Sequence, residues 1–372
     1  MRRVPTKKLK PGMKVGRSVI NANEQVLLAA GTILTETFIA RLQKLNIPSI
    51  YVDDGFLPDL QYNDVISEKV RYKAIQQTKK IFHDFRYTKN LVGLDKIESI
   101  VDDLVDELLN NKNIMVNLVD IRSNDEYTFG HCVNTCILSM ITALRLGYST
   151  NSIRLLAIGA ILHDLGKTLI PLEVLNKPGK LTAEEYHLVK KHSEYGFELL
   201  CQNTQFQNAS KLVVLHHHER YNGTGYPHGL ARNQIPQNSA IVGLADMYDA
   251  LTADRVYRSA YLPHEAFEML SASGDYLFEF DIVKAFLHHV AAYPIGSLVK
   301  LNTGEIAVVI QNRPGFSLRP KLRVLFLSNN EPCTDQFEID LAEVHNKTIT
   351  QVLNDTVDLD LLKNKHIKIN LP

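Results

Sequence analysis

The sequence predicts a mainly α-helical protein, with a small α+β region at the N-terminus and a β-rich segment at the C-terminus. Two observations support this fold class. Apolar residues recur at helical spacing through the middle of the chain, while both ends carry short strand-like runs between turn residues. The clearest helical stripe consists of Val133, Cys136, Ile137, Met140, Ile141 and Leu144. With 372 residues, the chain is long enough for two or three domains.

Residues 1–54 are expected to form an accessory α+β domain. Short strands are predicted first, with a turn at Gly31, and Thr35 can then cap a helix over residues 36–46. Residues 55–64 have few periodic apolar positions and are predicted to be a linker.

The middle of the chain is predicted to be almost entirely helical. Residues 65–124 are expected to be connecting helices, of which the stretch 65–111 can serve packing or dimerisation, and residues 125–293 to be the functional core. Within this core, Thr182 opens a capping box for a helix that ends at Leu200, and another helix follows Ser239.

Residues 294–372 are predicted to be a β-rich accessory segment. A hairpin is expected from strands over residues 297–301 and 306–310, with Gly304 in the turn between them. A third strand is expected over residues 322–327.

The composition excludes several classes of protein. Lys+Arg and Asp+Glu both number 41, so the net charge is zero, which argues against a partner that is a nucleic-acid polymer. No apolar run has the length of a membrane span or a secretory signal, so a cytoplasmic protein without membrane contact is expected. Four cysteines are too few for a disulfide framework, and Cys132 and Cys136 are interpreted as packing residues.

The central region carries an unusual set of histidines and aspartates at predicted helix positions. They are His131, His163, Asp164, His192, His216, His217, His218 and Asp246. Imidazole and carboxylate together suit Fe, Mn, Zn or Co better than Ca or Mg alone. The remaining histidines, among them His228, are interpreted as ordinary core or surface residues.

The adjacent pair His163-Asp164 is the most informative part of this set. It ends an apolar helix, and burying both groups without a metal would be costly. Side chains of neighbouring helical residues point in different directions. The Asp164 carboxylate could nevertheless bridge two metals while the neighbouring His163 binds only one of them. Two metals about 3.5–4 Å apart can hold a bridging hydroxide and clamp a phosphoryl oxygen, which is the chemistry of phosphoester hydrolysis.

Three segments carry a resemblance to a known family. HDLGK from His163 resembles the HD motif of HD phosphohydrolases, HHERYNGTGYP from His217 resembles the HHExxxGxGYP element, and DMYDALTADR from Asp246 resembles DxxDALTxxR. Together with the helix bearing His192, they occur in the order found in HD-GYP domains, over roughly residues 125–290. The sequence therefore resembles the HD-GYP family of metal-dependent cyclic di-GMP phosphodiesterases.

The resemblance implies a set of metal ligands, with Asp164 as the bridging, catalytic carboxylate. These are His131, His163, Asp164, His192, His217, His218 and Asp246. It implies two divalent transition-metal ions, iron or alternatively manganese. Some family members hold a third metal through a glutamate at the position of Tyr127 here, so two metals are expected rather than three. His216, one position before the matching His pair, is taken as a bystander or as a group that supports a ligand.

The resemblance also implies residues that contact the substrate. Lys167 matches the family's phosphate-binding, catalytic lysine, and Arg255 and Arg258 can grip phosphate oxygens, although Arg258 could equally form a surface salt bridge. Tyr226 could project toward the substrate or merely shape the rim of the site. The loop with Tyr226 is associated in the family with contacts to diguanylate cyclase domains.

The expected function is hydrolysis of the 3′-5′ phosphodiester bond of cyclic di-GMP by a metal-bridging hydroxide. The product is pGpG, and GMP if the linear form is accepted. The alternatives are a 3′3′-cyclic GMP-AMP phosphodiesterase, a non-catalytic cyclic-dinucleotide receptor and a diiron oxygenase of the HD type. A homodimer is compatible with these readings.

Overall fold

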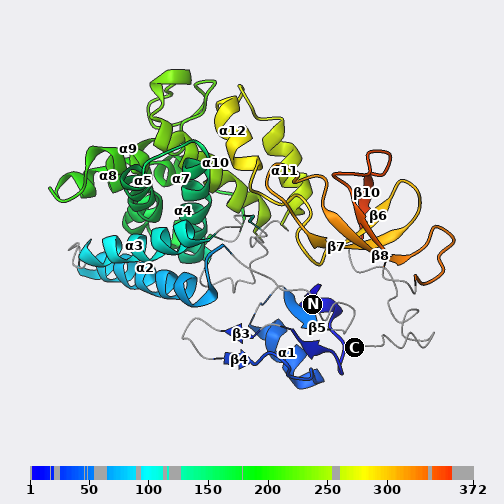
Figure 1. Ribbon diagram of the computed structural model, residues 1–372. Helices are drawn as coiled ribbons and strands as arrows, with labels where there is room; N and C mark the ends of the chain where they lie inside the picture. The colour runs from blue at the N-terminus through cyan, green and yellow to red at the C-terminus, as the bar shows by residue number, and fades with distance from the viewer. Residues whose placement is uncertain are drawn as a thin grey trace. The chain divides into compact units, whose positions relative to one another are not determined.

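The structure is a computed structural model that describes residues 2–16, 18–20, 26–45, 47, 49–53, 65–88, 94–111, 115–116, 127–177, 179–253, 260–333 and 337–353 (Figure 1). The chain divides into two compact units. The helical unit comprises Asn63–Val116 and Asn124–Val290. The other unit comprises Met1–Tyr62, Asn117–Ser123 and Ala291–Pro372. The mainly α fold class with β-containing ends is confirmed.

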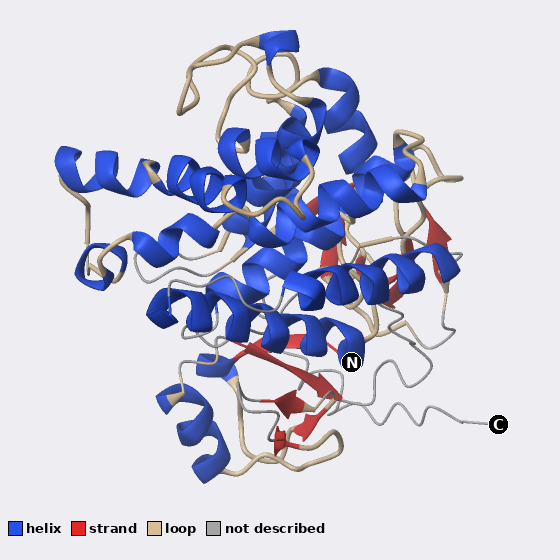
Figure 2. Cartoon of the chain, turned by 90° about the vertical axis from the view of Figure 1, so that its left-hand side faces the viewer, coloured by secondary structure: helices blue, strands red, loops and turns tan. Residues whose placement is uncertain are grey.

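The helical unit packs helix on helix (Figure 2). Its α-helices are α2 (Glu68–Thr88), α3 (Leu94–Asn110), α4 (Tyr127–Arg145), α5 (Thr150–Leu162), α6 (Leu172–Leu175), α7 (Ala183–Lys190), α8 (His192–Cys201), α9 (Asn208–His216), α10 (Gln237–Thr252), α11 (Pro263–Ser271) and α12 (Phe280–Leu287). Short 3-10 helices, η3 (Leu165–Leu169) and η4 (Arg232–Gln234), lie in its connections. None of the described helices is long and apolar enough to cross a membrane.

Helix α4 is the centre of the helical unit. It contacts α2, α3, α5, α10 and α12, and it is buried on every side from Gly130 to Ala143. The predicted stripe is buried from Val133 to Ile141 and half-buried at Leu144, and Cys132 and Cys136 are buried with free thiols. The helix also buries polar side chains, among them His131 and Asn134. The buried hydroxyl of Ser139 donates to the Thr135 carbonyl oxygen one turn earlier, at 2.7 Å.

Two predicted helix boundaries were wrong. The capping box at Thr182 is present, but the helix expected to end at Leu200 is interrupted at Lys191, and α8 begins at His192. The His192 ring bonds to the Val189 carbonyl oxygen at the end of α7 (2.7 Å). Helix α10 begins before Ser239, whose hydroxyl donates to the Leu212 carbonyl oxygen at 2.9 Å and so ties α10 to α9.

The N-terminal part of the other unit contains an antiparallel sheet in the order β1-β5-β2, formed by β1 (Arg2–Pro5), β5 (Ser49–Asp53) and β2 (Lys14–Val15). A second pair joins β3 (Val19–Ile20) to β4 (Val26–Leu28). Helix α1 (Glu36–Lys44) begins as predicted, since the Thr35 hydroxyl accepts from Phe38 N at 3.2 Å. The turn at Gly31 is present, with φ +86°. The predicted linker 55–64 lies outside the described residues.

The C-terminal part contains a five-stranded antiparallel sheet in the order β10-β6-β7-β8-β9. Its strands are β6 (Leu298–Leu301), β7 (Ile306–Gln311), β8 (Lys321–Phe326), β9 (Glu338–Asp340) and β10 (Ile349–Val352). The first three strands were predicted. The other two, β9 and β10, were not predicted, and they pair with β8 and β6 at the two edges of the sheet.

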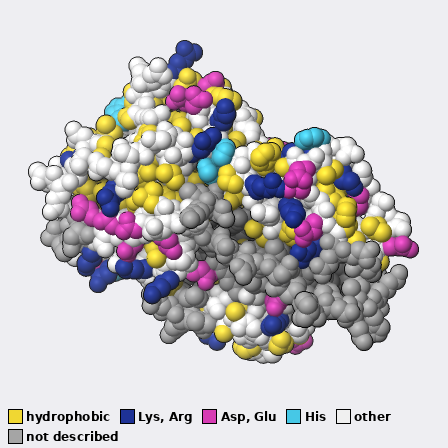
Figure 3. All heavy atoms as spheres, viewed as in Figure 1, with side chains coloured by type: hydrophobic (Ala, Val, Ile, Leu, Met, Phe, Trp, Pro, Cys, Tyr) yellow, Lys and Arg dark blue, Asp and Glu magenta, His cyan; other side chains and the backbone are white. Residues whose placement is uncertain are grey.

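Charges of both signs lie mixed on the described residues of the face shown in Figure 3. The same balance of 41 basic and 41 acidic residues holds for the whole chain. That part of the surface therefore shows none of the continuous basic stripe that tracks a nucleic-acid backbone.

Candidate metal centre

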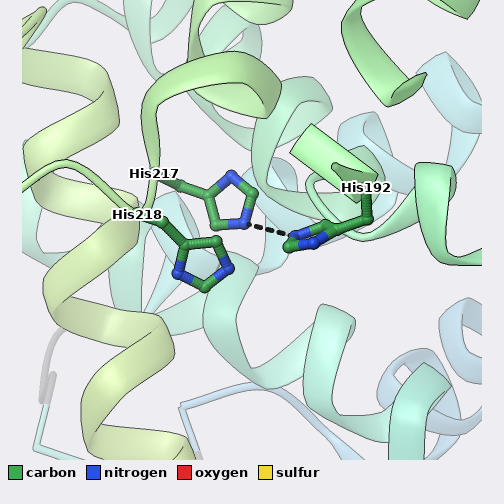
Figure 4. A group of neighbouring side chains, drawn as sticks. All are labelled: His192, His217 and His218. Atoms are coloured by element: carbon green, nitrogen blue, oxygen red, sulfur yellow. Dashed lines mark hydrogen bonds between the residues drawn. The ribbon is translucent and has the colours of Figure 1, made fainter. Parts of the chain in front are cut away.

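The helical unit brings all seven expected ligands together from five helices or helix ends. His131 lies in α4, His163 and Asp164 follow α5, His192 starts α8, His217 and His218 follow α9, and Asp246 lies in α10. The donor atoms fall into two groups. His131, His163 and Asp164 form one, and His192, His217 and His218 form the other (Figure 4 shows the second). Within each group the donor atoms lie within 4.8 Å of one another.

Asp164, a member of the first group, also reaches the second. Its Oδ2 atom is 3.5 Å from His163 Nε2, and its Oδ1 atom is 3.5 Å from His192 Nε2. The groups also approach directly, since the His163 and His217 ring centroids are 5.0 Å apart. Asp246 closes the arrangement, with one oxygen 2.9 Å from His131 Nε2 and the other 3.8 Å from His218 Nδ1.

Backbone carbonyls fix which ring nitrogen faces inward. The Nδ1 atoms of His163, His192 and His217 lie 2.7, 2.7 and 2.9 Å from the carbonyl oxygens of Ala160, Val189 and Val214. A carbonyl oxygen only accepts, so each Nδ1 carries the proton and each Nε2 presents a lone pair to the cluster. Ligands of a metal are oriented in this way by a hydrogen bond on their outer side.

The donor set fits a divalent metal. Asp164 Oδ1 and His163 Nε2 are buried and have no hydrogen-bond partner among the described residues. Such atoms are costly to bury unless something satisfies them. Imidazole nitrogens and carboxylate oxygens in one cavity suit a borderline transition metal. The cluster thus has the composition and geometry of a divalent-metal site.

Burial and charge set the protonation of the cluster. Burial lowers the pKa of His163, His217 and His218 below the usual value and lowers that of His192 to about 4, so these rings are neutral near pH 7. Burial also lowers the pKa of His131, but hydrogen bonds to Asp246 and Asp249 outweigh it and raise this pKa to about 9. The proton between His131 and Asp246 occupies a place that a cation can take.

Metal-free protein is expected to lose stability as the pH falls from 6.5 toward 4. In the unfolded chain His192 takes up a proton near pH 6.5, whereas in the folded chain its pKa is about 4. Between these pH values protonation stabilises the unfolded state more than the folded state, so the free energy of unfolding falls. His192 alone contributes on the order of 3 kcal/mol over this range. The measurement is the urea concentration at the midpoint of unfolding, determined at several pH values in the presence of excess chelator. A midpoint that stays constant between pH 6.5 and 4.5 would contradict the assignment.

Lys167 and Tyr226 lie at the edge of the cluster. Lys167 Nζ is 2.7 Å from Asp164 Oδ2, and about a third of the side chain is exposed. The Tyr226 ring stacks on the His218 ring, with centroids 4.6 Å apart at 25°. The side chains of His218 and Asp246 are 17% and 13% exposed, whereas those of the other five expected ligands are almost fully buried, so the cluster opens to solvent on their side.

Sequence reasoning missed a chain of polar side chains behind His131. His131 Nδ1 lies 2.6 Å from Asp249 Oδ2, and Asn134 Nδ2 donates to Asp249 Oδ1 at 3.1 Å. Arg71 in turn donates to Asn134 Oδ1 at 3.2 Å. The signal for Asp249 was its position three residues after Asp246, which places both carboxylates on one face of a helix.

Comparison with known proteins settles the family. The sequence matches the family model of the HD domain over residues 111–281, and that of the KOW domain associated with the HD domain over residues 298–360, which contain the five-stranded sheet. A cyclic di-GMP phosphodiesterase of Pseudomonas aeruginosa is 32% identical over 283 residues, covering 74% of this chain and 68% of that protein. The chain belongs to the HD-GYP family.

Two further relatives share shorter stretches. A cyclic di-GMP phosphodiesterase response regulator of Xanthomonas campestris is 42% identical over 148 residues, covering 40% of this chain and 39% of that protein. A 3′3′-cGAMP-specific phosphodiesterase of Vibrio cholerae is 31% identical over 188 residues, covering 50% of this chain and 36% of that protein. The chain therefore spans well under half the length of these two relatives.

The loop that gives the HD-GYP family its name, here residues 221–231, is held by one buried carboxylate. Glu219 accepts hydrogen bonds from the backbone N–H groups of His228 (2.8 Å) and Leu230 (2.9 Å). A side chain at Gly225 would overlap the Glu219 backbone, so only glycine allows this approach. Of the other residues expected in this HD-GYP site, Arg255, Arg258 and the Tyr127 side chain lie outside the described parts.

Proposed function

We propose that this chain is a cyclic di-GMP phosphodiesterase whose active centre is the seven-residue cluster. The observation that carries the proposal is the position of Asp164, within 3.5 Å of one imidazole from each of the two groups. A carboxylate in that position can bind both ions of a dinuclear site. The cyclic di-GMP phosphodiesterase of Pseudomonas aeruginosa, which aligns over most of this chain, supports the choice of substrate.

The ligands proposed for two ions are the cluster residues. His131, His163 and Asp246 would hold one ion, His192, His217 and His218 the other, and Asp164 both. When bound, two divalent metals activate a water as the nucleophile and offset the charge that develops on the phosphoryl oxygens. We propose iron, or alternatively manganese, and two ions rather than three.

The chain's own side chains then bind and orient the substrate. The Lys167 ammonium, next to Asp164 and a third exposed, is placed for a phosphate contact at the open side of the cluster. Tyr226, stacked on His218, presents an aromatic face beside the same opening. We assign Arg255 and Arg258 to the phosphate as well. The first product is pGpG, and GMP follows if the linear form is accepted.

The direct test uses protein purified without oxygen, with its bound metal quantified. Incubation with cyclic di-GMP is expected to yield pGpG or GMP, with two metal ions per chain. Full metal occupancy without any nucleotide product would overturn the proposal and favour a receptor or an oxygenase.

A second candidate substrate is favoured by one comparison. The Vibrio cholerae relative named as 3′3′-cGAMP-specific is about as similar over its aligned part as the Pseudomonas aeruginosa protein. Parallel assays with both cyclic dinucleotides separate the two, and we expect the higher kcat/KM for cyclic di-GMP. Contact of residues 221–231 with a diguanylate cyclase domain stays a prediction, which a pull-down experiment tests. A homodimer also stays a prediction, which sedimentation tests.

A further inference from the structure

We propose that His216, Glu219 and His228 form a separate metal site, for a borderline divalent ion such as Zn²⁺, which ties the loop 221–231 to the end of α9. One donor atom from each of the three lies within 4.8 Å of the others. None of them belongs to the seven-residue cluster. Sequence reasoning took His216, one position before the matching His pair, as a bystander or a group that supports a ligand, and took His228 as an ordinary core or surface histidine.

His216 provides the first independent observation. Its side chain is only 8% exposed, and its Nδ1 atom is buried without a hydrogen-bond partner among the described residues. The Glu219 Oε1 atom is 3.8 Å away, too far for a hydrogen bond. Two ligands that each lie about 2.0–2.2 Å from one zinc ion are at most about 4.4 Å apart, so this spacing fits a shared ion.

Glu219 provides the negative charge. Its side chain is fully buried, and no Lys or Arg side chain of the described residues comes within ion-pair distance of it. Its oxygens accept the backbone N–H groups of His228 and Leu230, which fixes the carboxylate in place. Each carboxylate oxygen has a second lone pair, so these hydrogen bonds leave room for a metal.

His228 supplies the open side of the site. It is exposed, and its ring centroid is 5.3 Å from that of His216. An ion can therefore enter from solvent and keep a water as a further ligand. Two imidazoles and one carboxylate with an open position are a familiar donor set for Zn²⁺, and Cu²⁺ or Ni²⁺ would also bind it.

The site is chemically distinct from the cluster beside it. His216 and His217 are neighbours in the chain, and successive side chains at a helix end point in different directions. His217 faces His192 at 3.3 Å between Nε2 atoms, whereas His216 faces Glu219. An ion at the new site would fasten His228, two residues beyond Tyr226, and so restrain the loop that places Tyr226 on His218.

The test counts zinc on the full chain. Wild-type and variant proteins loaded with Mn²⁺ are dialysed against micromolar Zn²⁺ in a large excess of Mn²⁺, which opposes exchange of the more tightly binding Zn²⁺ into the cluster, and both metals are measured. We expect His228→Gln to bind one zinc fewer per chain, or to bind it at least 10-fold more weakly, with its manganese unchanged. The matched control is His187→Gln, an exposed histidine of α7, which should bind zinc like the wild type.

A double substitution makes the test sharper. If His216 and His228 hold the same ion, the variant His216→Gln/His228→Gln loses no more zinc than His228→Gln alone. Equal zinc binding by wild type and His228→Gln would overturn the site. Additive losses of one ion for each histidine would overturn it as well, because they would mean two unrelated weak sites. Retained manganese in His228→Gln separates this outcome from a failure of the proposed active centre.

Discussion

Asp164→Asn is expected to lose phosphodiesterase activity by more than about 100-fold and to retain at most one metal ion per chain. Loss of a residue that only supports a ligand already costs about 10–100-fold, and Asp164 is placed to be a ligand itself. Its two oxygens lie 3.5 Å from His163 Nε2 and from His192 Nε2. An amide has one oxygen and no charge, so it can serve one ion at best.

The measurement pairs metal analysis with product chromatography on the same samples. Asp106→Asn, an exposed substitution on α3, serves as the matched control and should behave like the wild type. Circular dichroism checks that the variant is folded. A folded Asp164→Asn protein with two bound ions and full activity would remove Asp164 from the centre.

Asp249→Asn is expected to weaken metal binding about 10–100-fold while leaving kcat nearly intact at saturating metal. Asp249 is 3% exposed and accepts from His131 Nδ1 with one oxygen and from Asn134 with the other. An asparagine has only one acceptor oxygen. Whichever way its amide turns, an NH₂ group faces one of these two donors, and the His131 ring loses its fixed orientation.

This split between affinity and rate distinguishes a positioning residue from a ligand. Metal affinity is measured by competition with a chelator, and activity is then followed as metal is added back. Unchanged affinity would show that His131 does not depend on Asp249. Activity that stays low at saturating metal would place Asp249 in direct contact with the reaction instead.

The resemblance implied the set of expected ligands, and the structure brings them together because each lies in or directly after a helix of the same unit. His163 and Asp164 end an apolar helix, and His217 and His218 also follow a helix directly, so each pair reaches the same interior. The core of α4 was predictable because its apolar stripe is long and regular. These features depend on short stretches of sequence.

Features that depend on pairs of distant residues could not be predicted. Asn134 and Asp249 are 115 positions apart, and neither residue type is distinctive alone. His216 and His228 meet only because Glu219 draws the loop back to the end of α9. The interruption at Lys191 escaped notice because no glycine or proline marks it.

Gly166, three residues after His163, touches backbone rather than side chains. A Cβ atom there would overlap the His192 carbonyl, and one at Gly243 would overlap the His217 carbonyl. Main chain thus meets main chain beside His192 and His217, where no larger residue can be accommodated. A larger residue at Gly166 or Gly243 would therefore push apart the backbone segments that carry the histidines, so these two glycines set how closely the ligands can approach one another.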